Sequence, residues 1–121
     1  MRRLFLVVLG LLAWFATESA PGHSTLTRSE PGNRTTLKQA PDEIRIWFTE
    51  PIKVGLSTIE VRNASGKQVD QRDLRADGKD PTLVHLSLPA GLKPDTYQVS
   101  WIAVADDLHV SKGSFSFRIA P

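Results

Sequence analysis

The sequence predicts an all-β fold, a Greek-key, immunoglobulin-like β-sandwich of about seven strands. From Thr25 onward, short runs of alternating polar and apolar residues are separated by turn signals at intervals of about ten residues, which is typical of such sandwiches. No helical period competes with this alternation. Cysteine is absent, so the fold must be held by its core rather than by disulfides.

The first 22 residues have the composition of a secretory signal peptide. Arg2 and Arg3 form a short positive region, and the apolar run from Leu4 to Ala16 is too short to span a bilayer. The small residues Ala20 and Gly22 suit cleavage after Gly22. The arginine pair leaves general and twin-arginine export both open. We therefore expect a signal peptide at 1–22 and one exported domain at 23–121, with no stable membrane insertion after cleavage.

The predicted strands each turn one apolar face inward. The strand at 42–49 is ended by Pro51, which has no N–H for a strand ladder. A weak, polar strand is expected at 69–75, and the strand at 96–105 is expected to be central because both of its faces are apolar. Asp95-Thr96-Tyr97 resembles a tyrosine corner. The residues expected to face inward are Ile44, Ile46, Phe48, Ile59, Val61, Val84, Leu86, Leu88, Tyr97, Val99, Trp101, Ala103, Phe115, Phe117 and Ile119.

Charge and motifs exclude several classes of function. The formal charge of +2 falls to +1 without the leader, with 13 basic and 12 acidic residues, so no nucleic-acid footprint is expected. The sequence contains no phosphate-binding loop, nucleophile elbow or H-E-x-x-H motif. Asp106 and Asp107 are adjacent and, in extended backbone, would point apart rather than form an acid–base pair. We therefore expect no enzyme activity.

The remaining chemistry lies in Asp107, His109 and His23. Asp107 and His109 are two residues apart, so in extended backbone both side chains leave the same side of the chain. Cleavage after Gly22 would make His23 the N-terminus, where its α-amine and imidazole can chelate one ion. The resulting set of three nitrogens and one oxygen suits Cu(II), which prefers tetragonal geometry.

Four further residues have a metal-ligating or aromatic side chain. Glu50, at the bend before Pro51, is a possible distal carboxylate ligand. His85 has the opposite parity to its apolar neighbours and is expected to face solvent. Trp47 and Trp101 are assigned to packing.

Several segments together resemble the CopC family of periplasmic copper-binding and copper-resistance proteins. The most specific is the Y-x-V-x-W block that runs into D-x-H, and the resemblance covers essentially the whole mature chain. The segments are Ser29-Glu30-Pro31, Ile44 to Pro51, Leu88 to Gly91, Tyr97 to His109 and Gly113 to Phe117.

The resemblance implies a periplasmic protein with a copper site built from His23, Asp107 and His109, working with a membrane partner of the CopD type. Some relatives also carry a methionine-rich Cu(I) site. The mature chain has no methionine, because Met1 is the only one, so a single Cu(II) site is expected. Two alternatives stay open: a metal-independent immunoglobulin-like interaction module and an oxidative copper enzyme.

Overall fold

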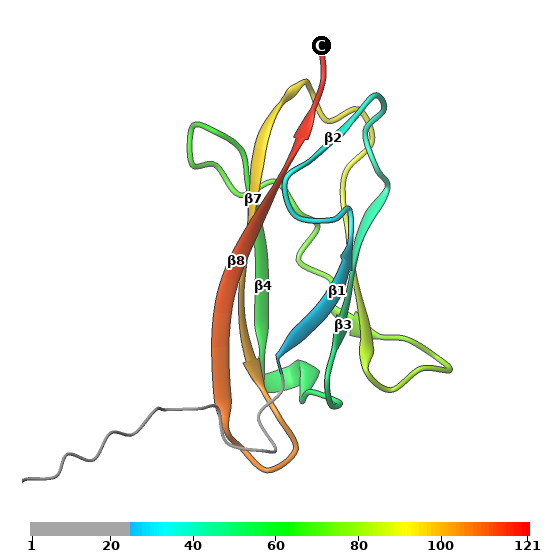
Figure 1. Cartoon of the computed structure of the whole chain (residues 1–121), viewed down its shortest axis with the longest axis vertical. Coiled ribbons are helices and arrows are strands. Elements are labelled where there is room, and N and C mark those ends of the chain that lie inside the picture. Colours follow the sequence, from blue (N-terminus) through cyan, green and yellow to red (C-terminus); the bar gives the residue numbers. More distant parts are fainter. Residues whose placement is uncertain (1–24) are drawn as a thin grey trace, which may run out of the picture.

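Two four-stranded sheets packed face to face make up the fold of residues 25–121, the part of the chain that the computed structural model describes (Figure 1). One sheet has the order β1-β3-β6-β5 and the other the order β2-β8-β7-β4, so the chain crosses repeatedly between layers. The strands are β1 (Leu26–Glu30), β2 (Thr35–Leu37), β3 (Glu43–Phe48), β4 (Thr58–Arg62), β5 (Arg75–Ala76), β6 (Leu83–Ser87), β7 (Asp95–Val104) and β8 (Val110–Ile119), with a 3₁₀ turn η1 (Val54–Leu56).

This architecture confirms the predicted β-sandwich, with eight strands where about seven were expected. The structure includes two very short strands, β2 with three residues and β5 with two, and these raise the count above seven. The predicted signal peptide at 1–22 and the cleavage site before His23 lie outside the described residues. Within 25–121, no helix has the length and apolarity needed to cross a membrane.

The buried core consists of the residues that alternate inward along the strands. In β3, Ile44, Ile46 and Phe48 are buried while the residues between them are partly exposed. Every residue predicted to face inward is buried, as alternation in a half-buried strand requires. β7 lies inside its sheet, between β8 and β4, as predicted. The Tyr97 hydroxyl donates to the backbone carbonyl of Lys93, which confirms the tyrosine corner.

The predicted strand at 69–75 was wrong: only Arg75 of this segment enters a strand. The Asp70 carboxylate accepts hydrogen bonds from the backbone N–H of Val61 and of Arg72, both at 2.9 Å. Arg72 itself has a positive φ of 58°, which interrupts extended backbone. Side-chain to backbone bonds of this kind compete with a strand ladder.

Trp101 fills the core beneath the β7–β8 hairpin. Its ring meets Phe48 edge to face, with 5.5 Å between centroids. Gly113, its partner across the β7–β8 ladder, leaves room for the indole. A Cβ at position 113 would lie 2.7 Å from Cζ2 of Trp101, closer than carbon atoms can approach.

We expect Gly113→Ala to lower the free energy of unfolding by about 1–3 kcal/mol, because the added methyl must displace a packed indole. Urea denaturation followed by Trp fluorescence measures this. Gly78→Ala is the matched control, since a Cβ at Gly78 has nothing within 4 Å. Equal stability of the two variants would contradict the close packing of Trp101 on Gly113.

Candidate metal centre

Asp107 and His109 lie in the tight loop that joins β7 to β8. The N–H of Ala105 donates to the carbonyl of His109 at 3.0 Å, and the N–H of Leu108 donates to the carbonyl of Ala105 at 2.8 Å. Within this loop, 105–109, the bond between Ala105 and His109 encloses the three residues 106 to 108. Leu108 has a φ of 72°, which is the left-handed conformation expected at the end of a three-residue hairpin loop.

The expected extended backbone at D-x-H was wrong, but the two side chains do come together. The turn directs the Asp107 carboxylate back onto His109: Oδ1 accepts from the His109 backbone N–H at 3.1 Å, and Oδ2 lies 2.9 Å from Nδ1 of the ring. The spacing of Asp107 and His109 predicted that their side chains converge. The left-handed backbone at Leu108, and not extended backbone, brings them together.

The pair has the electrostatics of a site prepared for a cation. The hydrogen bonds from the His109 ring and backbone lower the pKa of Asp107, so this carboxylate keeps its negative charge to lower pH than an ordinary aspartate does. Both side chains are exposed, by 43% for Asp107 and 56% for His109, so an ion can reach them. A metal that takes both residues would replace the proton that they share.

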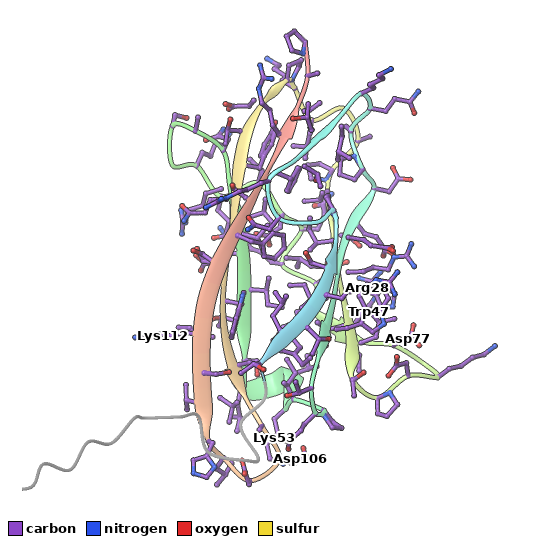
Figure 2. All side chains as sticks on the ribbon, viewed as in Figure 1. Arg28, Trp47, Lys53, Asp77, Asp106 and Lys112 are labelled. Atoms are coloured by element: carbon purple, nitrogen blue, oxygen red, sulfur yellow. The ribbon has the colours of Figure 1, made fainter. Side chains whose placement is uncertain are left out.

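The start of the described chain lies at the same end of the sandwich as this loop (Figure 1). Two hydrogen bonds join Thr25 to Thr49. The Thr49 backbone N–H donates to the Thr25 carbonyl, and the Thr25 backbone N–H donates to the Thr49 hydroxyl. Three residues further on, Ile52 forms a β-bridge with Ala105, the first residue of the loop. The segment 49–53 thus connects the two regions, and Figure 2 shows Lys53 and Asp106 close to this end.

The other two predicted ligands are His23 and Glu50. His23 lies outside the described residues. Glu50 lies in the connecting segment 49–53, but residues 25–121 contain no group of three His, Asp or Glu side chains arranged to hold a metal. Among residues 25–121, the predicted ligands that the structure brings together are the pair Asp107 and His109.

The prediction that His85 faces solvent was wrong. Its side chain is only 16% exposed, and it lies between two carboxylates, with Nε2 2.7 Å from Asp77 and Nδ1 3.2 Å from Glu43. Strand parity put His85 on the outer face correctly, but it gave no information on the loop after β5 that brings Asp77 over the ring. The backbone N–H of Asp80, followed by the His85 ring, lowers the pKa of Asp77.

Trp47 and Trp101 have the packing roles expected of them. Trp101 belongs to the buried core. On the outer face of β3, the Arg28 guanidinium carbon lies 4.1 Å from the centroid of the Trp47 ring, a cation–π contact. Figure 2 labels the two residues next to each other.

Comparison with known proteins gives a family match over nearly all of the described chain. The family model for the CopC domain matches residues 26–120. Copper resistance protein C of Xanthomonas campestris pv. juglandis is 30% identical, with 98% of this chain and 96% of that protein covered. The copper transport protein CutJ of Bacillus subtilis is 30% identical over 98% of this chain, but the chain spans only 22% of the length of CutJ.

A solved structure agrees with these matches. The crystal structure of PcoC, a methionine-rich copper resistance protein from Escherichia coli, superposes with a TM-score of 0.68 at 27% identity. The alignment covers 80% of this chain and 98% of PcoC.

Leu108 occupies a conformation that costs a leucine about 1–2 kcal/mol and that asparagine tolerates better. We therefore expect Leu108→Asn to raise the free energy of unfolding, by about 0.5–1 kcal/mol, in urea titrations. Leu56→Asn is the matched control, because Leu56 is equally exposed, at 60% against 62%, and has no positive φ. If Leu108→Asn lowered the free energy of unfolding as much as Leu56→Asn does, the strain at Leu108 would be contradicted.

Proposed function

The chain belongs to the CopC domain family, and from that premise we propose that it binds a single Cu(II) ion for copper storage, transport or resistance. The observation that carries the proposal is the Asp107–His109 pair at the end of the sandwich where the described chain begins. His23 precedes Thr25 by two residues, which span about 7 Å when extended. An N-terminal His23 can therefore reach this end.

The proposed ligand set is the His23 amine and imidazole, the Asp107 carboxylate and the His109 imidazole. Three nitrogens and one oxygen match the preference of Cu(II). Asp107 contributes the negative charge that a carboxylate carries at neutral pH, and the hydrogen bonds from His109 lower its pKa further. Glu50 is proposed as a distal carboxylate only, since it belongs to the connecting segment 49–53. In this scheme Cu(II) is cargo, and the protein carries out no catalytic turnover.

The proposed location is the periplasm, reached through a signal peptide at 1–22 that is removed before His23. The proposed source or recipient of copper is a membrane protein of the CopD type. Two relatives named for copper resistance and copper transport support a role in copper handling rather than a metal-independent interaction module.

We expect His109→Ala and Asp107→Ala to weaken Cu(II) binding by more than the roughly 10–100-fold that loss of an outer-shell partner costs, because each removes a ligand. Competition with a Cu(II) chelator measures the affinity. His85→Ala is the control: its ring is committed to Asp77 and Glu43, so copper affinity should stay within about twofold even if stability falls. A His85 variant as impaired as the His109 variant would contradict the assigned ligands.

The N-terminal chelate is tested separately with protein that begins at His23 and protein that carries one additional residue before it. The additional residue removes the amine–imidazole chelate without altering the sandwich, so copper affinity should fall while the urea midpoint stays the same. Equal affinity of the two forms would exclude the amine as a ligand.

Reduction should release the copper. Cu(I) prefers sulfur donors, and residues 23–121 contain neither cysteine nor methionine. With ascorbate present, copper should pass to bicinchoninate, a Cu(I) chelator, whereas in air the protein should hold Cu(II) against a competitor of comparable strength. Retention of the reduced ion would contradict a site built from nitrogen and oxygen alone.

A further inference from the structure

The exposed large apolar side chains of residues 25–121 gather at the metal end of the sandwich. They are Leu56, Ile102, Leu108 and Val110, with exposed fractions of 60%, 44%, 62% and 58%. Leu108 lies between Asp107 and His109, and Val110 follows His109 directly. Leu56 ends the turn η1, which contacts β7. Clustering at one place distinguishes this patch from the scattered apolar residues of an ordinary surface.

The strand register makes two of these residues, Ile102 and Val110, neighbours on the outer face of the sheet. Val110 lies opposite Val104, and Ile102, two residues before Val104 on the same face, lies opposite Lys112. Leu56 continues this surface, because the next residue, Ser57, accepts a hydrogen bond from the Val104 N–H through its hydroxyl. We call Leu56, Ile102, Leu108, Val110 and Lys112 the hairpin face.

Leu108 adds an energetic argument. Its left-handed φ of 72° favours glycine or asparagine, yet the position carries a leucine whose side chain is 62% exposed. The strain is not offset by burial in the fold. Strained residues concentrate where a binding surface requires a particular side chain.

A hollow beside the apolar residues would help a partner to dock. It has a volume of about 360 Å³ and adjoins Ile102 and Lys112. Its lining also includes Trp101, Ser100 and Ser114, so it offers both apolar and hydroxyl-bearing side chains to a partner.

We propose that the hairpin face docks the protein that exchanges copper with this one, a conclusion that rests on the function proposed above. A partner covering Leu108 and Val110 also covers Asp107 and His109, as ligand exchange requires. The partner is expected to present an apolar surface with a carboxylate facing Lys112. Figure 2 shows Lys112 projecting outward from β8.

The charges around the face disfavour two other occupants. A second copy paired edge to edge around Lys112 would bring two lysines together, and like charges opposed across strands are destabilising. An anionic lipid surface would meet Asp106 and Asp107 at the loop tip, where both are exposed. A protein with its own copper ligands fits without either conflict.

The test begins with a photo-crosslinking residue at Val110 or, as a control, at Arg118, which is exposed at the opposite end of β8. Both full chains are expressed in the producing organism, and adducts are identified by mass spectrometry. An adduct with a copper-transport protein from position 110 and not from 118 is expected. An adduct of two copies of this chain, equal adducts from both positions, or none would overturn the proposal.

The captured protein is then purified and used as copper acceptor or donor for the full-length mature protein. We expect Ile102→Ser/Val110→Ser to slow copper transfer at least about tenfold, while Cu(II) affinity measured by competition stays unchanged. Arg118→Ser should match the wild type in both measurements. Unchanged transfer by the double variant overturns the docking face, whereas a wild type that binds no copper overturns the proposed function instead.

Discussion

The ladder between β7 and β8 is the constraint on which the rest of the structure depends. Ten residue pairs, from Asp95–Ile119 to Val104–Val110, fix the register of two strands whose inner faces form much of the core. A slip of one residue would turn out of the core either Val99 and Trp101 on β7 or Phe117 on β8, so the register is strongly determined. The same register fixes the length of the loop, and with it the place where Asp107 and His109 meet.

Packing beneath the hairpin links this register to the metal end. Trp101 lies against Gly113 on one side and Phe48 on the other, so the indole joins the hairpin to β3 in the facing sheet. β3 leads directly to Thr49, which binds Thr25, and then to Ile52, which bridges to the loop. The start of the described chain, the end of β3 and the hairpin loop are therefore held together by core packing and backbone hydrogen bonds, and not by the metal ligands themselves.

The sequence predicted what depends on alternation and missed what depends on contacts between distant segments. Inward residues such as Ile44 and Phe117 follow from a period of two, and their burial confirms the prediction. The left-handed Leu108 could not be predicted, because leucine carries no signal for that conformation. Nor could the Asp70 bonds that replace the strand at 69–75, since their acceptor and the Val61 donor are nine residues apart. His23 remains a prediction that the described residues do not test.

His85 and His109 are both paired with aspartates, yet only one of them is suited to a metal. Both ring nitrogens of His85 face carboxylates, Asp77 on one side and Glu43 on the other, and its side chain is 16% exposed. An ion could reach a nitrogen there only by separating β3 from the loop after β5, which would break a partly buried network. Asp107, which pairs with His109, lies two residues away in an exposed loop, so both side chains are accessible to an ion. A histidine–aspartate pair is therefore structural on the sheet face, at His85 and Asp77, whereas the pair at the hairpin tip, His109 and Asp107, is available for metal binding.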